Sequence, residues 1–373
     1  MSGPLDTIPV GVQRAVLRGL LGLPAPVRRL LAGPPVRRDG QTLAVPAQLV
    51  LRARHLGGAR GLAAATPALA RAAMLRDNRV VGGPPPPGVH VRALAVAGAS
   101  ASLPARLYWP AGLARPAPLV VFYHGGGWVV GDLDSHDHLC RFLARQAGVA
   151  VLAPHYRRAP EHPFPAAVTD ALATHAFAVR QAGALGVDPR RIALAGDSAG
   201  GNLAVVTALR SRAEPGPRPV FLLLFYPAVD ATRRRRSREL FAEGFLLTSR
   251  DMDWFMDHYQ PDPAARADPA LSVLLADDLS GLPPTYLATA GFDPLRDEDE
   301  AFAARLAEQG VPVVLRRHPD LIHGFANLFG LGGPFRDAVV EAAGALRAGL
   351  VLGASPADAS PAGAPADQRA AGQ

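Results

Sequence analysis

The feature of this sequence that most restricts its fold is a series of short apolar runs separated by stretches with helical spacing. The runs are LVVFYH (119–124), VAVLAP (149–154), RIALAG (191–196), VFLLLFYP (220–227), TYLATAG (285–291) and VPVVLRR (311–317). Parallel strands that are buried on both faces require runs this short and this apolar. The segments with helical spacing are 166–182, 199–212 and 296–309. The pattern predicts repeated β–α units and a mostly parallel sheet.

The N-terminal segment has a different amino-acid composition, which is rich in Ala, Leu, Arg and Pro. One helical stripe in it carries Val12, Val16, Leu17, Leu20 and Leu21. This spacing predicts a short amphipathic helix. We interpret the helix as packed on the main domain, with a lid or a membrane-surface element as the alternative.

Two further composition shifts divide the chain. The run GGPPPPG at 82–88 cannot be a helix or a central strand and so marks a junction. Segment 228–284 interrupts the alternation, and the last twenty residues are low-complexity Ala, Pro, Gly and Asp. We expect a cap segment at 1–88, a main domain at 89–353 with a cap insertion at about 228–284, and a disordered tail at 354–373.

All 39 basic residues are arginine, and this excludes several chemistries. Without lysine there is no Schiff base, no pyridoxal phosphate anchor and no Walker A lysine. The net charge is +7, but the arginines are scattered and lack interleaved aromatic residues, so we expect no nucleic-acid partner. The run RRRRSR at 233–238 is interpreted as a solvated surface, including Arg233 to Arg236. The alternative is a basic rim that attracts anionic acyl substrates or a membrane surface.

Compartment and membrane signals are weak. No stretch approaches the ~20 consecutive apolar residues of a membrane span, and the start MSGPLDTIPVGVQRAV lacks a secretory signal pattern. The single Cys140 cannot form an internal disulfide or a zinc knuckle. We therefore expect a soluble cytoplasmic protein without stable membrane insertion, although peripheral membrane contact stays open.

The most informative motif is GDSAGG at 196–201, which lies directly after an apolar run and directly before a helical stretch. It satisfies G-x-S-x-G in a strand–turn–helix context, where small residues permit a strained turn that exposes the serine hydroxyl. Ser198 is therefore the predicted nucleophile. The alternative is a structural serine that caps the helix.

A serine nucleophile needs a base and an acid that orients the base. Asp293 follows the run TYLATAG and is the predicted acid. His323, in LIHGF, is the predicted base and is favoured over His318, which precedes a proline. The rival acids are interpreted as solvated residues of a helix's first turn: Asp297, Glu298 and Asp299.

The motif HGGG at 124–127 can present bare backbone N–H groups to an oxyanion. We expect Gly125 and Gly126 to donate, together with Ala199. A phosphate loop is disfavoured because both glycine-rich phosphate motifs are missing. A metal site, which would use His124 with Asp134, His136, Asp137 and His138, is also disfavoured. Asp134 or Ser135 is the simpler cap of the following helix, so we predict no metal and no cofactor.

These motifs resemble the hormone-sensitive-lipase-like branch of the α/β-hydrolase esterases, which includes many bacterial carboxylesterases. The matching segments cover roughly 105–330 and are HGGGWVVGDLDSHDHLCR, YRRAPEHPFPAAVTDA, GDSAGGNLA, FAEGFLLT, DLSGLPPTYLATAGFDPLRDE and LIHGF. The resemblance implies an eight-stranded, mostly parallel sheet with helices on both faces and a helical cap. It also implies a Ser198–Asp293–His323 triad, oxyanion donors at Gly125, Gly126 and Ala199, and a structural role for His124.

The function implied by this resemblance is serine carboxylic-ester hydrolysis through an acyl-enzyme. The expected partner is a small-molecule ester with a short to medium acyl chain. Two alternatives remain: a lipase acting on longer-chain or membrane lipids, and a non-catalytic ligand-binding homologue. Amide, thioester or lactone hydrolysis by the same triad and a homodimeric state also stay open.

Overall fold

The computed structural model describes residues 8–58, 61–98 and 100–352. The tail predicted at 354–373 and the first residues of the predicted cap segment lie outside the described residues. The fold is built on an eight-stranded sheet with the strand order β10-β9-β8-β7-β5-β6-β4-β3. The strands are β3 (Val89–Ala97), β4 (Ser102–Pro110), β5 (Ala117–Tyr123), β6 (Ala150–Pro154), β7 (Val187–Asp197), β8 (Phe221–Phe225), β9 (Thr285–Phe292) and β10 (Val313–Ile322).

The sheet is mostly parallel, as predicted. The strands from β6 across to β10 pair in parallel, and only β4 runs antiparallel to its neighbours β3 and β6. Each of the six apolar runs overlaps one of the strands β5 to β10. The apolar runs do not predict β3, because this edge strand is largely exposed and its side chains are not continuously apolar.

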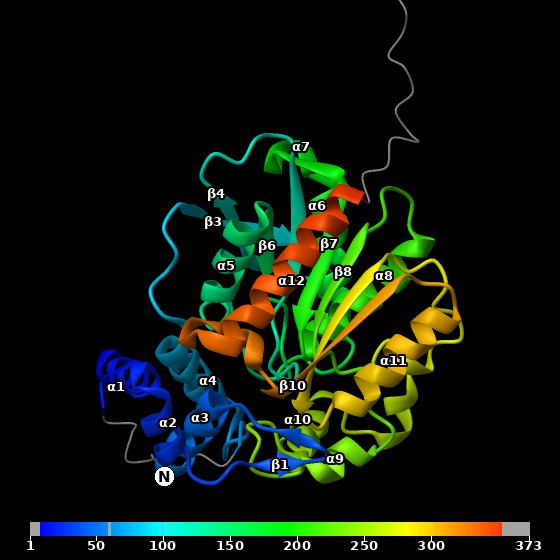
Figure 1. Cartoon of the computed structure of the whole chain (residues 1–373). Helices are drawn as coiled ribbons and strands as arrows, with labels where there is room; N and C mark the ends of the chain where they lie inside the picture. The colour runs from blue at the N-terminus through cyan, green and yellow to red at the C-terminus, as the bar shows by residue number, and fades with distance from the viewer. Residues whose placement is uncertain (1–7, 59–60, 99, 353–373) are drawn as a thin grey trace, which may run out of the picture.

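Helices cover both faces of the sheet (Figure 1). One face packs against α5 (Asp137–Ala147) and α12 (Gly333–Leu352), and residues Val120 and Phe122 of β5 join that core. Residues Leu119 and Val121 point to the other face, where they join the core with side chains of three helices. These are α6 (Ala166–Arg180), α8 (Ala199–Arg210) and α11 (Arg296–Glu308), and the short α7 (Ala182–Leu185) precedes β7.

A helical cap lies at the carboxyl ends of the parallel strands (Figure 1). Its N-terminal part contains α1 (Val10–Gly22), α2 (Ala25–Ala32), α3 (Val45–Leu56) and α4 (Pro67–Gly82), with a small hairpin of β1 (Arg37–Arg38) and β2 (Gln41–Thr42). The segment between β8 and β9 adds α9 (Arg236–Leu240), α10 (Ser249–Tyr259) and the 3₁₀ turns η2 (Pro263–Ala267) and η3 (Val273–Leu275). Two more 3₁₀ turns, η1 (Ser211–Ala213) and η4 (Phe325–Leu331), follow α8 and β10.

Specific hydrogen bonds attach the N-terminal cap to the sheet. Gln41 Nε2 donates to the Gly291 carbonyl at 3.1 Å, and the Ala44 N–H donates to the Asp320 carbonyl at 2.9 Å. Both acceptors lie at the ends of β9 and β10, which carry two of the predicted site residues. The cap is thus held in place next to the predicted site.

The apolar stripe predicted near the N-terminus forms α1, but it is not packed as expected. The helix has no buried residue, and Val12 and Val16 are 50% and 65% exposed. Leu17 is partly buried against the main core. The amphipathic pattern therefore describes a helix whose apolar side is only half covered.

In the arginine run at 233–238, Arg233, Arg234 and Arg236 are exposed, as predicted for a solvated surface, but most of the arginines of the run are also paired. Arg234 and Arg238 both pair with Asp253 of α10. Arg235 pairs with Asp230, and Arg236 pairs with Asp39 of the β1–β2 turn. Of these ion pairs, Arg236–Asp39 connects the two parts of the cap, and the other three lie within the cap insertion. Among the helices that the structure describes, none combines the length and apolar character needed to cross a membrane.

Candidate active site

Ser198 lies at a sharp turn between β7 and α8. Its backbone has φ 54° and ψ −120°, a conformation that costs energy for a residue with a side chain. The turn is tight because glycines flank it: a Cβ on Gly200 would lie 2.0 Å from the Tyr123 carbonyl oxygen, and one on Gly196 would lie 2.3 Å from Gly200. The Ser198 N–H donates to the Phe225 carbonyl at 2.9 Å. This geometry projects the hydroxyl away from the sheet.

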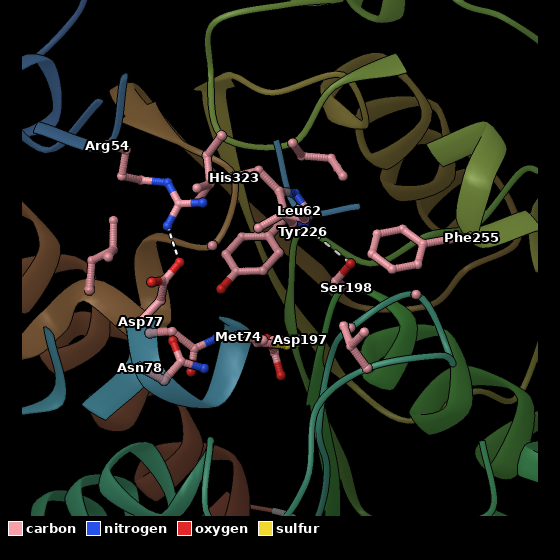
Figure 2. A pocket seen from close by; sticks show the side chains of 18 of the residues that line it. Arg54, Leu62, Met74, Asp77, Asn78, Asp197, Ser198, Tyr226, Phe255 and His323 are labelled. Atoms are coloured by element: carbon pink, nitrogen blue, oxygen red, sulfur yellow. Dashed lines mark hydrogen bonds and ion pairs between the residues drawn. The ribbon is translucent and has the colours of Figure 1, made fainter. Parts of the chain in front are cut away.

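Asp293 and His323, the other two predicted residues of the triad, converge on Ser198. Figure 2 marks the contact between His323 and Ser198 with a dashed line. Asp293 directly follows β9, and His323 directly follows β10. His323 Nε2 lies 3.2 Å from Ser198 Oγ, and His323 Nδ1 lies 2.7 Å from Asp293 Oδ2. The other oxygen of Asp293 accepts the Leu295 N–H at 2.9 Å, so the carboxylate is fixed from both sides. The structure thus brings together the three residues in the order acid, base and nucleophile.

The rival residues are engaged elsewhere. His318 lies within β10 against Phe325, and burial lowers the pKa of His318 to about 4. Glu298 and Asp299 lie in the first turn of α11, as predicted, but they are buried, so the prediction that they are solvated is wrong. The helix turns both towards the core: Glu298 accepts the Val229 N–H at 2.9 Å, and Asp299 accepts the Thr289 hydroxyl at 2.7 Å. Burial raises the pKa of Glu298 to about 8 and raises that of Asp299 as well.

The glycine loop after His124 corrects one expected oxyanion donor. The Gly125 N–H donates to Asp197 Oδ1 at 2.8 Å and is therefore already occupied. A Cβ on Gly125 would lie 2.6 Å from the same carboxylate, so glycine is needed there for close packing. Gly126 and Gly127, with φ of 120° and 56°, line the cavity together with Ser198 and Ala199. The available N–H groups are thus those of Gly126, Gly127 and Ala199.

The carboxylate of Asp197 lies at the centre of a buried network that sequence reasoning missed. Asp197 Oδ2 accepts from Asn327 Nδ2 at 2.9 Å and lies 3.3 Å from His136 Nε2. Burial acts to raise the pKa of Asp197, but His136 and the hydrogen bonds from His136, Gly125 and Asn327 lower it by more. The net pKa is lowered, so a carboxylate anion holds the glycine loop. The one signal for this role was the position of Asp197 next to the predicted nucleophile.

His124 occupies the supporting position that the resemblance implied. Its ring stacks on Tyr156 with centroids 4.2 Å apart, and its Nδ1 lies 2.9 Å from the Gly125 carbonyl oxygen. The Tyr156 hydroxyl donates to the His124 carbonyl at 2.7 Å. Burial, followed by the neighbouring His136, lowers the pKa of His124 well below its ordinary value. A neutral imidazole therefore supports the loop through Nδ1–H.

The residues of the alternative metal cluster point to different partners. Asp134 and Asp137 both pair with Arg106, whereas His138 Nε2 lies 3.0 Å from the Asn327 carbonyl oxygen. Across the described part of the chain, no three His, Cys, Asp or Glu side chains are grouped as they would be around a metal ion.

The prediction that Asp134 or Ser135 caps the helix after this cluster is wrong. α5 begins at Asp137 with His136 as its N-cap, while Ser135 closes a turn with Asp132.

Ser198 and His323 open into a cavity of about 540 Å³ between the sheet and the cap. Figure 2 shows Leu62, Met74 and Phe255 of the cap around them. The lining is mainly apolar, and Val12, Val16 and Leu20 of α1 extend it towards the outside. Its polar wall includes Arg54 and Asp77, which form an ion pair with each other. A cavity of this size and composition suits a small organic ligand with an apolar portion.

Comparisons with known proteins agree with this geometry. A family model described as the alpha/beta hydrolase fold matches residues 120–327, and the chain belongs to this family. The carboxylic ester hydrolase LipN of Mycobacterium tuberculosis is 48% identical over 337 residues, which cover 88% of this chain and 89% of that protein. An ethyl acetate hydrolase of Pseudomonas putida is 41% identical over 230 residues, 61% of this chain and 72% of that protein.

A solved structure agrees as well. The esterase of Pyrobaculum calidifontis superposes with a TM-score of 0.75 at 37% identity, covering 82% of this chain and 98% of that chain. Within the family, these relatives confirm the predicted membership of the hormone-sensitive-lipase-like esterases.

Proposed function

We propose that this chain is a serine carboxylic-ester hydrolase that works through an acyl-enzyme on small ester substrates. The observation that carries the proposal is the hydrogen-bonded series from Asp293 through His323 to Ser198, which lies at the floor of an apolar cavity. Each residue lies within reach for its role. The names of the relatives support the same reaction class.

In the first half of the reaction, Ser198 Oγ attacks the ester carbonyl carbon while His323 Nε2 takes the hydroxyl proton. Asp293 holds the Nδ1–H tautomer and stabilises the imidazolium that forms. When the carbon–oxygen bond to the alcohol breaks, His323 gives its proton to the leaving oxygen. In the second half, His323 activates water, which attacks the acyl-enzyme and releases the acid. The chemistry requires no metal and no organic cofactor.

The tetrahedral intermediates carry negative charge on the former carbonyl oxygen. We assign its stabilisation to the N–H groups of Gly126, Gly127 and Ala199, which are close to Ser198 in sequence or in the loop facing it. Gly125 acts indirectly, because its N–H anchors the loop to Asp197. The oxyanion site thus depends on backbone atoms that are held by a buried carboxylate.

The cavity supports a preference for short to medium acyl chains. Phe255 of α10 packs directly on the glycine loop, since a Cβ on Gly127 would lie 2.3 Å from its ring. Phe255 therefore limits the space beside Gly127 at the floor of the cavity, while the exposed Val12 and Val16 of α1 give its opening an apolar lining. A compact acyl group suits the floor, and an apolar alcohol or a longer chain suits the opening.

The test is a panel of p-nitrophenyl esters with acyl chains from acetate to palmitate, assayed with the unchanged chain and with Ser198→Ala. We expect the highest kcat/KM at short to medium acyl lengths and a loss of at least about 10³-fold in the variant. A fluorophosphonate probe should label one peptide, the one that contains Ser198. Labelling of another residue, or full activity in Ser198→Ala, would contradict the proposal.

A further inference from the structure

The cap helices α1 to α4 expose more large apolar side chains than the rest of the described chain. Seven of the eleven large apolar side chains that are exposed in the described residues lie in α1 to α4. Leu30 of α2 is 81% exposed, and Leu56 at the end of α3 is 73% exposed. We use the name α1–α2 surface for the exposed apolar side chains of α1 and α2 together with Leu56 at the end of α3. Its members are Val12, Val16, Val27, Leu30, Leu31 and Leu56. Concentrated apolar exposure of this kind marks an interaction surface.

The same segment carries only positive charge. Residues 8–38 contain six arginines and no Asp or Glu; the arginines are Arg14, Arg18, Arg28, Arg29, Arg37 and Arg38. Arg14 donates to the Arg79 carbonyl, and within the described residues no carboxylate pairs with any of the six. In the cap insertion, by contrast, Arg234, Arg235 and Arg238 each pair with an aspartate. Arginines without a carboxylate partner, such as Arg210 and Arg233, also occur elsewhere in the described residues, but residues 8–38 combine six of them with no Asp or Glu.

The α1–α2 surface adjoins the route to the nucleophile. Val12, Val16 and Leu56 line the cavity that leads to Ser198 and are at the same time exposed. α1 and α2 lie at the outer edge of the cap, away from the sheet (Figure 1). A ligand that covers this surface would thus lie directly at the mouth of the cavity.

We propose that the α1–α2 surface docks on an anionic lipid surface. Exposed aliphatic side chains insert at the boundary between headgroups and acyl chains, while arginines bind the lipid phosphates. A second copy of this chain is a poorer fit, because two such surfaces would bring six unpaired arginines against six others. Since docking places the cavity mouth against the lipid, apolar esters dissolved there could reach Ser198 directly. That last consequence rests on the proposed function, whereas docking itself does not.

The test measures binding without turnover, so it stands apart from the proposed reaction. Full-length Ser198→Ala protein is sedimented with vesicles of phosphatidylcholine alone or of phosphatidylcholine with 30% phosphatidylglycerol. We expect at least about tenfold stronger partitioning onto the anionic vesicles and a clear loss of binding in 0.5 M salt. Arg29→Gln and Arg38→Gln should each weaken binding about fivefold. Val16→Asp and Leu30→Asp should weaken it at least as much.

Matched controls use exposed residues far from this surface. Val314→Asp on β10 and Arg210→Gln at the end of α8 should bind like the parent, and thermal unfolding should show that all variants fold. Equal binding to neutral and anionic vesicles, no binding, or variants that bind like the controls would overturn the proposal. So would a dimer in solution that Val16→Asp or Leu30→Asp converts to a monomer, because the surface would then serve a second copy.

Discussion

Asp197→Asn tests whether a buried carboxylate holds the oxyanion loop. The two carboxylate oxygens accept from the Gly125 N–H at 2.8 Å and from Asn327 Nδ2 at 2.9 Å. An asparagine offers one oxygen and one NH₂ group, so it can satisfy only one of these donors and turns a donor towards the other. Hydrogen bonds to a charged group contribute about 1.5–3 kcal/mol each. We therefore expect the free energy of unfolding to fall by about 2–4 kcal/mol.

The catalytic effect follows from the position of Gly125. If the loop loses its anchor, the neighbouring N–H groups of Gly126 and Gly127 no longer converge on the oxyanion, and each well-placed donor is worth about 10²–10³ in kcat. We expect kcat for p-nitrophenyl butyrate to fall about 10²-fold and KM to change less than about threefold, because the cavity walls are not altered. Steady-state kinetics and chemical denaturation at the same pH measure both effects.

Exchanging the side chains of Asp197 and Asn327 distinguishes a loss of loop positioning from a general loss of stability. Asn327→Asp alone places a second carboxylate beside Asp197 and should be at least as damaging. The double variant Asp197→Asn with Asn327→Asp restores one donor opposite one acceptor and should recover at least about tenfold in kcat over Asp197→Asn. The loop does not depend on this network if Asp197→Asn keeps kcat within about twofold of the unchanged chain. The same conclusion follows if the loss of kcat in the double variant is no smaller than the two single losses combined.

Two further predictions concern the acids near the site. Asp293→Asn should reduce kcat about 10³–10⁴-fold with little change in KM, because the amide stabilises the wrong imidazole tautomer, and p-nitrophenyl ester kinetics measure this. Glu298→Gln tests the effect of a buried acid on stability. Burial raises the pKa of Glu298 to about 8 from an ordinary value of 4.5. Between these two pH values, the folded state therefore keeps a proton that the unfolded state releases. Stability should therefore decline as pH rises from about 4.5 to 8, by at most about 1.4 kcal/mol per pH unit from this group, and denaturation curves of Glu298→Gln should lack that share of the decline.

The parallel part of the sheet was predictable because its strands are buried on both faces. A continuous apolar run as short as 119–124 favours a buried strand over a helix, and β5 spans Ala117–Tyr123. β3 gave no such signal, since most of its side chains are exposed and its place at the sheet edge follows from pairing with β4. Apolar runs thus locate the strands on which the site is built and miss the edge of the sheet.

The convergence of the three proposed triad residues could be predicted for a similar reason. Parallel strands end at one edge of the sheet, so residues that directly follow β7, β9 and β10 must lie near one another. No sequence pattern, by contrast, indicates the direction in which a single backbone N–H group points. It depends on local backbone angles, such as the φ of 120° at Gly126, and on a carboxylate 72 residues away at Asp197. The assignment of Gly125 as a donor failed at this level.

The charged residues show why local patterns mislead about partners. Glu298 and Asp299 have the sequence signature of first-turn acids, but the helix orientation that buries them depends on packing against β9 and the cap insertion. Likewise, segments 233–238 and 8–38 are both rich in arginine. In the first segment, Asp253 pairs with Arg234 and Arg238, and Asp39 pairs with Arg236. In the described structure, no carboxylate pairs with the arginines of the second segment. Net charge therefore says little about which arginines are available to a partner, because the arrangement of the cap decides which of them meet a carboxylate.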